Sequence, residues 1–499
     1  MRWLNEPLPL GIKTMTDAVL IVGAGPVGLT LALELSRYKV PVRLIDKMAM
    51  RSDKSRAVAL WSRSLELLER AGLSDELLNA GNKVRAANML AQGRHIARLD
   101  FSDVETPYPY ALMIPQYDTE AILERQLTSF GISAELGVEL VHFVQDSYGV
   151  ATTLRRSDGT DETSRFSWVI GCDGAHSTIR HKLGLPFVGD TMPIDWTLGD
   201  FHMNGSPFGL EELATYWHQD GFIVFFPMAP GRYRIIASLG PSTNQEPIPP
   251  SLKEFQEIVD KRGPGGLVLS DSLWTTAFRI NERQVANYRS GRIFLAGDSA
   301  HVHSPAGGQG MNTGIQAAVN LAWKLALVCR GISDAPELLD SYSSERRPVG
   351  AAVIRSAGRL SNLATIRNSS AQQVRNAMFH VIMGLKPMRQ VMEESMTEIS
   401  VGYPKSPLNG VSKMRGPLER IRRATDTPKA SYLKRSDTPE VPELDAPDLA
   451  TLNVQRRRVL PRRELRAEGV PLCVLELQVC CREFLAHRLL DHFVAFIGA

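Results

Sequence analysis

The sequence predicts an α/β fold in which a Rossmann-like nucleotide-binding domain is interrupted by an inserted β-sheet domain. Three short motifs support this prediction: GAGPVG at residues 23–28, Asp-Gly at residues 173–174 and Gly-Asp at residues 297–298. Each motif follows an apolar run of the kind that forms a buried parallel strand. A second β-rich block, at residues 190–280, lies between the last two motifs and is therefore expected to be an insertion.

The first motif has the full context of a dinucleotide site. An apolar strand at residues 18–22 precedes the glycines, a helix follows them, and a second strand ends in Asp46. Gly23 permits the tight turn, Gly25 leaves room for a pyrophosphate, and Gly28 lets helix and strand pack closely. We expect the helix N-terminus to offer N–H groups to a diphosphate and Asp46 to accept ribose hydroxyls. The alternative is a purely structural glycine turn.

The order of these segments predicts the domain boundaries. The meander expected before the second motif and the helices expected after the third both belong to the nucleotide-binding part. The predicted units are an N-terminal extension at residues 1–14, a nucleotide-binding domain with a helical segment at 15–184 and 285–400, a β-sheet domain for the substrate at 185–284, and a poorly defined C-terminal region at 401–499.

Composition limits the class of protein. The chain has 499 residues, 43% of them hydrophobic and 22% charged, which is typical of a soluble protein with two or three domains. The net charge of +3 is too small to predict nucleic-acid binding. The five cysteines form no CxxC pair, and the sequence lacks a membrane-spanning run and a signal peptide. We therefore expect a cytoplasmic protein with no nucleic-acid partner and no membrane span.

In their order and spacing, the three motifs resemble those of class A flavoprotein monooxygenases with the para-hydroxybenzoate hydroxylase fold. The most similar subgroup comprises phenol hydroxylase, pentachlorophenol monooxygenase-like enzymes and aromatic polyketide hydroxylases. The resemblance covers residues 16–408. It implies bound FAD, NADPH or NADH as co-substrate, and O2 that reacts at the flavin to give a C4a-hydroperoxide. The implied activity is hydroxylation of a phenolic or polycyclic aromatic substrate.

The cofactor site predicted from the first motif and from the resemblance spans several separate segments of the chain. Asp298 is expected to accept a ribityl hydroxyl, and the start of the helix after Gly308 is expected to face the flavin N1–C2 region. Asp173 has an alternative role as a helix cap near Ser177. The predicted cofactor residues are Gly23, Gly25, Gly28, Asp46, Lys47, Arg56, Gln116, Asp173, Gly174, Gly297, Asp298, Pro305, Gly308, Gly310, Met311 and Asn312.

The substrate pocket is predicted from the inserted domain, on Phe225, Phe226, Pro227 and Arg234. Alternation along a strand places one of the two phenylalanines on the far face. No catalytic residue is assigned, because Val58 stands where phenol hydroxylase has an aspartate. His301 and His303 lack a third ligand nearby, so no metal site is predicted.

Two further features leave alternatives open. After Tyr403, where relatives carry a thioredoxin-like domain, residues 413–466 are rich in Arg and Pro. This region is interpreted as a degenerate domain or shifted reading frame, or as a basic tail for an acidic partner.

Lys47 and Arg51 favour NADPH, because a 2′-phosphate requires cations.

The main functional prediction is aromatic hydroxylation of a small-molecule substrate, and the oligomeric state considered is a homodimer. One alternative is an antibiotic-modifying monooxygenase that acts on a tetracycline- or rifamycin-like compound. Another is a flavin-dependent reductase or a non-catalytic FAD binder. Fold alone does not separate these activities, so the pocket must decide between them.

Overall fold

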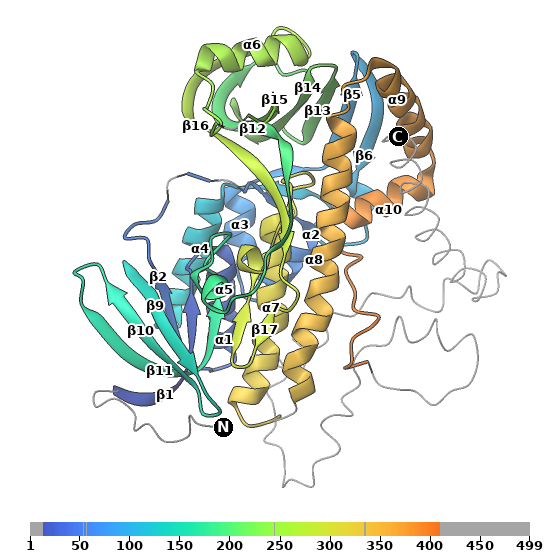
Figure 1. The fold of residues 1–499 in the computed structure, drawn as a ribbon. Helices are drawn as coiled ribbons and strands as arrows, with labels where there is room; N and C mark the ends of the chain where they lie inside the picture. Colours follow the sequence, from blue (N-terminus) through green and yellow to red (C-terminus); the bar gives the residue numbers. More distant parts are fainter. Residues whose placement is uncertain (1–12, 53, 56, 244, 334–335, 410–499) are drawn as a thin grey trace, which may run out of the picture.

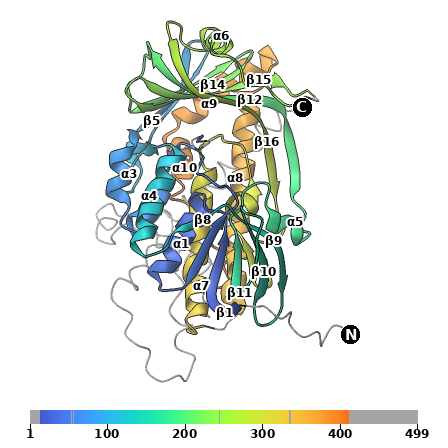
Figure 2. The same cartoon turned by 90° about the vertical axis from the view of Figure 1, so that its left-hand side faces the viewer.

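The computed structural model describes residues 13–409, apart from residues 53, 56, 244 and 334–335. Two large β-sheets form two layers of the molecule, and long strands and one long helix run between them (Figures 1 and 2). This arrangement confirms the predicted α/β fold with an inserted sheet. Residues 410–499 of the predicted C-terminal region (401–499) and residues 1–12 of the predicted N-terminal extension (1–14) lie outside the described residues.

The first sheet is the predicted nucleotide-binding sheet. Its strands run in the order β17-β18-β11-β1-β2-β8, and β9 and β10 continue it antiparallel from β11. The strands are β1 (Lys13–Val22), β2 (Val42–Asp46), β8 (Ala134–Leu136), β9 (Val138–Gln145), β10 (Val150–Arg156), β11 (Asp161–Gly171), β17 (Arg289–Ser290) and β18 (Ile293–Leu295). Helices α1 (Pro26–Arg37) and α7 (Gly310–Cys329) pack against each other beside it.

The register of the first sheet brings the three motifs to one edge. Val22 pairs with Gly171 in the parallel ladder of β1 and β11, and Gly171 pairs with Leu295 of β18. Val22 also pairs with Ile45 of β2. Since the carboxyl ends of parallel strands lie together, the loops that follow these four strands meet at the same place. Motifs far apart in sequence therefore build one site.

The second sheet forms the other layer, in the order β19-β16-β12-β15-β14-β13-β5-β6. Its strands are β5 (Ala86–Ala91), β6 (Arg94–Asp100), β12 (Val188–Asn204), β13 (Glu212–His218), β14 (Gly221–Ala229), β15 (Arg232–Pro241), β16 (Val268–Gln284) and β19 (His301–Val302). Helix α6 (Leu252–Arg262) packs on its outer face. Strands β12 and β16 pair with each other along most of their length.

The sheets and the predicted boundaries differ at residues 86–100. The boundaries assign this segment to the nucleotide-binding domain, whereas β5 pairs parallel with β13 and extends the second sheet. Every residue of β5 is buried, so its sequence AANMLA shows no alternation of apolar and polar residues. The partner of β5 lies more than a hundred residues away, and local pattern carries no information about it.

The remaining elements connect and cover the two sheets. A small third sheet joins β3 (Ala59–Leu60), β7 (Ala111–Met113) and β4 (Asn82–Val84). The short helices are α2 (Ser62–Glu69), α3 (Ser74–Ala80), α4 (Gln116–Ser129) and α5 (Thr178–Lys182), with 3-10 turns at Phe101–Asp103 and Gly297–Ser299. The helical segment comprises α8 (Pro336–Ala364), α9 (Ser369–Gly384) and α10 (Lys386–Met396), and α9 packs on β6 (Figure 1).

Alternation along β14 separates two cores. Val224 belongs to the core that faces the rest of the molecule, with Phe222 and Phe226 packed against it. Ile223 and Phe225 belong to the core under α6. The inner face of the second sheet is therefore lined by every second residue of β14. In the part of the chain that the structure describes, no helix is long and apolar enough to cross a membrane.

Candidate functional site

The first glycine loop has the geometry that its sequence predicts. Gly23 has a φ of +104°, a conformation that L residues rarely adopt. A Cβ on Gly28 would lie 1.9 Å from the carbonyl oxygen of Gly23, so α1 approaches the turn too closely for any side chain there. Both glycines are thus required by the packing of the protein itself.

Gly25 differs from its two neighbours. Its φ of −74° and ψ of −174° suit any residue, and a Cβ would lie 4.0 Å from its nearest neighbour, Glu120 Oε1. As the N-cap of α1 it provides no side-chain cap for the amides of the first turn. The space above Gly25 and these amides forms a cradle for an anion, which fits the diphosphate of a dinucleotide.

Asp46 lies beside this cradle. Its Oδ2 accepts a hydrogen bond of 2.8 Å from the N–H of Ala24, and its Oδ1 accepts one of 2.9 Å from the N–H of Met48. These bonds hold the carboxylate at the end of β2, where a ribose can donate to its remaining lone pairs. The residues present therefore fit a bound dinucleotide.

The loop after β11 places Asp173 against the first glycine turn, where a Cβ on Gly23 would meet the Asp173 Cα at 2.9 Å. Asp173 Oδ2 accepts a hydrogen bond from the N–H of Ile179 (3.1 Å), which matches the alternative role as a cap near Ser177. Its Oδ1 is buried and has no partner among the described residues. Burial raises the pKa of this carboxyl. One oxygen thus serves the helix, and the position of the other fits a hydroxyl donor of a ligand. Gly174 follows with a φ of +77°.

The third motif interlocks with the first. Gly297 has a φ of +65°, and a Cβ there would lie 2.8 Å from Val27 Cγ2 of α1. The same valine side chain lies 2.6 Å from the position of a Cβ on Gly314 in α7. Small residues at these two positions let α1, α7 and the third motif converge. Asp298 lies exposed on this edge, where it can reach a polyol.

The start of α7 is held by the side chain of Asn312. Its Oδ1 accepts a hydrogen bond from the Trp61 N–H, and its Nδ2 donates to the carbonyl oxygens of Ala59 and Gly308 (all 2.8–2.9 Å). The N-cap Gln309 provides no side-chain cap. Gly310 and Met311 therefore contribute backbone amides at the positive end of the helix, which fits an electron-rich carbonyl of the flavin ring.

The other predicted cofactor residues lie around these loops. Pro305 is exposed, and its carbonyl oxygen accepts the N–H of Gly308 at 2.9 Å. Lys47 is exposed after β2. Gln116 begins α4, and its Nε2 donates to Glu120 Oε1 at 2.8 Å. Arg56 lies outside the described residues. Which of these side chains contact a cofactor remains a prediction.

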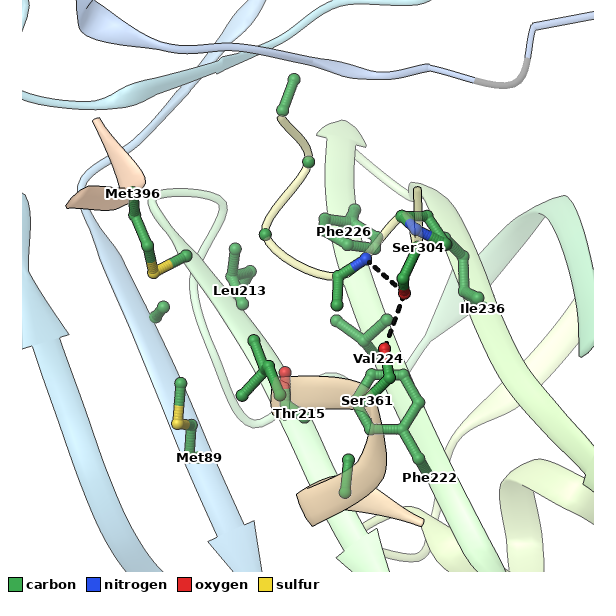
Figure 3. A pocket seen from close by; sticks show the side chains of 18 of the residues that line it. Met89, Leu213, Thr215, Phe222, Val224, Phe226, Ile236, Ser304, Ser361 and Met396 are labelled. Carbon is green, nitrogen blue, oxygen red and sulfur yellow. Dashed lines mark hydrogen bonds between the residues drawn. The ribbon is translucent and has the colours of Figure 1, made fainter. Parts of the chain in front are cut away.

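A largely apolar cavity opens between the second sheet and the loop before α7 (Figure 3). The space that the centre of a water molecule can occupy is about 90 Å³. The described residues that line it include Leu213, Thr215, Phe222, Val224, Phe226, Ile236, Trp61, Trp196 and Trp217, together with residues 304–308 of the loop, Leu360, Ser361 and Ala364 of α8, and Met396. Ser304 and Ser361 share a hydrogen bond of 2.6 Å on one wall.

The four predicted pocket residues take different positions. Phe226 lines the cavity, whereas Phe225 packs into the opposite core with its ring 5.8 Å from that of Tyr216. Pro227 is buried, and its carbonyl oxygen accepts from Asn82 Nδ2 at 2.9 Å. Arg234 is fully buried and bound through two hydrogen bonds, of 2.7 and 2.8 Å, to Asp200. Of the four, only Phe226 belongs to the described lining.

The cavity wall holds no acid or base among its described residues. Its lining contains no Asp, Glu, His, Lys, Tyr or Cys, and Val58 is buried in the neighbouring core. His303 Nδ1 is hydrogen-bonded to the carbonyl oxygen of Ser304 at 2.7 Å, and burial lowers the pKa of His301 to about 3. No group of three metal-ligating side chains occurs within the described residues.

Several residues that line the cavity were not predicted from the sequence. Three tryptophans supply much of the cavity wall, and Trp61 Nε1 also donates to the Gly307 carbonyl oxygen at 2.8 Å. Trp217 stands next to His218, which is half-exposed and lies outside the lining. The alternation of β13 was the available signal, because it places Leu213, Thr215 and Trp217 on one face.

A buried carboxyl ties α7 to the segment that follows α10. Glu398 is 1% exposed and accepts hydrogen bonds from Thr313 Oγ1 (2.9 Å) and Gln316 Nε2 (2.5 Å). Burial raises the pKa of this carboxyl from 4.5 to about 8. The folded state thus favours the protonated form, and stability is lost as the pH rises from about 5 through 8.

We expect Glu398→Gln to flatten this pH dependence. Each unit of pKa shift corresponds to about 1.4 kcal/mol, so the wild type should lose several kcal/mol across this window. The variant keeps a side chain of the same shape but does not ionise, and the Gln316 amide can rotate to present its oxygen. Melting temperatures measured at several pH values would check this. Parallel pH profiles for both proteins would contradict it.

Taken together, these loops fit an FAD-binding flavoprotein, and a largely apolar cavity adjoins them. Comparison with known proteins gives the family. The family described as FAD binding domain matches residues 16–357. The chain belongs to this family of flavin-dependent aromatic monooxygenases, as its resemblance to class A enzymes predicted.

Individual relatives agree with this assignment. The chain is 37% identical over 405 residues to 6-methylpretetramide 4-monooxygenase of Streptomyces rimosus, covering 78% of this chain and 70% of the relative. It is 34% identical over 340 residues to pentachlorophenol 4-monooxygenase of Sphingobium chlorophenolicum, covering 66% and 62%. The solved structure of OxyS anhydrotetracycline hydroxylase from Streptomyces rimosus is similar, with a TM-score of 0.67, 29% identity and coverage of 81% and 79%.

Proposed function

We propose that this protein uses NADPH or NADH and dioxygen to hydroxylate a phenolic or polycyclic aromatic compound. The observation that carries the proposal is the loop of residues 304–308. This loop lines the apolar cavity and leads into α7, whose N-terminus fits a flavin carbonyl. A flat ligand in the cavity would therefore lie next to the redox centre, which is the arrangement that oxygen transfer to a ring requires.

FAD, when bound, supplies the redox chemistry by accepting a hydride from NAD(P)H and passing electrons to dioxygen. In the overall reaction one oxygen atom enters the ring, the other leaves as water, and NAD(P)H is oxidised. The chain's own residues orient the ligand and exclude water. The aromatic and aliphatic side chains that line the cavity, among them Trp61 and Met396, provide the dry surroundings that protect a reactive oxygen species from water.

The substrate class follows from the wall and from the relatives. Thr215, Ser304 and Ser361 are the described hydroxyl groups in an otherwise apolar lining, so the ligand is expected to be mostly apolar with few polar groups. The similar enzymes named above act on pentachlorophenol, 6-methylpretetramide and anhydrotetracycline. We propose the cytoplasm as the compartment, because the reaction consumes NAD(P)H.

Oxygen uptake by the FAD-loaded protein tests the proposal. Phenols, polycyclic polyphenols and tetracycline- or rifamycin-like antibiotics would be supplied one at a time with NADPH and then with NADH. Uptake that depends on one ring class, with a product heavier by one oxygen atom, would support hydroxylation. NAD(P)H oxidation that yields a ligand carrying two more hydrogen atoms and no added oxygen would identify a reductase, and no turnover of any kind would identify a non-catalytic FAD binder.

We expect Val224→Phe to block the cavity without affecting the flavin. Val224 is 5% exposed on β14 and points into the cavity (Figure 3). The larger ring would occupy volume that the ligand needs, so we expect the Kd for aromatic ligands to rise by about tenfold or more, which corresponds to about 1.4 kcal/mol or more of binding free energy. Calorimetric titration of aromatic ligands would measure this, with Val268→Phe at an exposed position as control. Unchanged affinity for every ligand would place the substrate elsewhere.

A further inference from the structure

Arg375 on α9 is a buried cation that the proposed reaction does not use. Its side chain is 1% exposed. Nη1 donates to the Leu363 carbonyl oxygen at 2.7 Å, while Nε and Nη2 donate to Asn376 Oδ1 at 3.0 and 2.8 Å. All of these acceptors are neutral. The guanidinium is thus hydrogen-bonded but has no anion among its described partners.

Among the described residues, two other buried arginines lie close to this sheet. Arg262 donates to the Ser238 carbonyl oxygen at 2.6 Å and has the charge of Asp220 nearby, whereas Arg234 is fully paired. Arg234 is compensated by the two carboxylate oxygens of Asp200. For Arg375, burial is the sole influence on the pKa, which it lowers to about 10, so the side chain remains charged at neutral pH. The carbonyl end of α8 offers only partial negative charge. A buried charge without a counter-ion is costly, and the structure leaves this one uncompensated.

The uncompensated charge lies directly behind the cavity wall. The guanidinium carbon of Arg375 is 4.7 Å from the centre of the Trp217 ring, within the range of a cation–π contact. Trp217 is one of the side chains that line the cavity, and Phe379 of α9 packs on it at 5.0 Å. One indole ring therefore contacts both the cation and the space where the ligand is proposed to bind.

Nothing in the described wall competes with this charge. The lining has no carboxylate that could neutralise Arg375 and no base that could take a proton from a phenol. In apolar surroundings the effective dielectric constant is lower, so an electrostatic interaction is stronger at a given distance than it is in water. An anionic group on the ligand would therefore feel the guanidinium across the Trp217 ring.

We propose that Arg375, acting through Trp217, makes the cavity select its aromatic ligand in the anionic form, as a phenolate or an acidic enolate. This inference rests on the proposed aromatic substrate and adds the charge state of that substrate. Arg375 is a positioning residue, because it touches Trp217 rather than the ligand. Anion selection takes the place of a base in the wall: the ligand loses its proton to solvent, and the cavity stabilises the ionised form.

Calorimetric titration of the FAD-loaded protein with two matched probes tests this proposal. The probes are 4-nitrophenol, at a pH above its own pKa, and 4-nitroanisole, which has the same ring but stays neutral. A unit charge about 10 Å away at an effective dielectric constant of about 20 changes Kd by about tenfold. We expect the wild type to prefer the anion by about this factor, and Arg375→Gln to lose that preference.

Three variants separate charge from structure. Arg375→Gln keeps a donor for the Leu363 carbonyl oxygen, Arg375→Lys keeps the positive charge but loses the guanidinium fork, and Arg367→Met removes an exposed arginine just before α9. We expect Arg375→Lys and the control Arg367→Met to retain the preference for the anionic probe. If Arg375→Lys and Arg375→Gln weaken the binding of both probes equally, Arg375 serves only to cap α8 and the proposal is overturned.

If Arg375→Gln fails to fold, the affinities of the wild type for the two probes still test the proposal. Equal affinity for the two probes overturns anion selection and leaves the aromatic site intact. Binding of neither probe contradicts the proposed aromatic cavity, and this inference fails with it. Anion preference in the wild type that Arg375→Lys preserves supports the proposal.

Discussion

Replacing Gly25 by alanine is expected to weaken FAD binding by about ten- to hundredfold while leaving the apo protein as stable as the wild type. The backbone at Gly25 suits an alanine, and the new Cβ would meet no protein atom closer than 4.0 Å. The methyl group would instead enter the cradle at the N-terminus of α1. There it would occupy space that the diphosphate needs, and the expected loss in affinity corresponds to about 1.4–2.7 kcal/mol of binding free energy.

Gly28→Ala provides the contrast, because its Cβ would lie 1.9 Å from the carbonyl oxygen of Gly23. That variant should lose stability as an apo protein as well as FAD affinity. Gly384→Ala, where a Cβ meets nothing within 4 Å, serves as control. The measurements are the melting temperature of apo protein and the Kd for FAD from flavin fluorescence. Unaltered FAD affinity in Gly25→Ala would show that the cradle does not hold the diphosphate.

Removal of the Asp200 carboxylate is expected to destabilise the second sheet by about 3–5 kcal/mol, the range for breaking a buried ion pair. Asp200 and Arg234 are both fully buried and directly opposed on β12 and β15. Asp200 Oδ2 also accepts from Trp274 Nε1 at 3.1 Å. In Asp200→Ala the guanidinium would stay buried without its counter-ion, which is the origin of the large effect.

The double variant Asp200→Ala/Arg234→Met removes both charges and should recover much of this loss. Denaturant unfolding of the three proteins would measure it. Arg234 Nη1 also donates to the Ala57 carbonyl oxygen at 3.2 Å and so joins the second sheet to the loop before β3. A loss below about 1 kcal/mol in the single variant, the value of an exposed pair, would contradict a structural role for this ion pair.

Local pattern was sufficient to predict the nucleotide-binding edge of the molecule. The roles of Gly23 and Gly28 follow from backbone geometry within a few residues, and the strand ending in Asp46 lies close to them in sequence. The meeting of the three motifs was predictable because parallel strands end at one edge of a sheet. This rule predicts that motifs far apart in the sequence lie close together in the fold.

The cavity could be predicted only in part. Alternation separates Phe225 from Phe226 but does not reveal which of them faces inward, because that depends on where α6 packs. The wall contributed by Trp217 and Met396 requires the pairing of β13 with β5 and the folding of α10 toward the loop before α7. Both are contacts between segments far apart in sequence, and they depend on tertiary packing rather than on local propensity.

The most direct test of the central claim, that this flavoprotein transfers oxygen to an aromatic ring, is turnover under isotopically heavy dioxygen. The FAD-loaded protein would be supplied with NAD(P)H and the ring class that stimulates oxygen uptake, and the product would be analysed by mass spectrometry. A single heavy oxygen atom on the ring is the predicted result. An oxidised product without the heavy label, or oxygen consumed entirely to hydrogen peroxide with every ligand, would contradict monooxygenation.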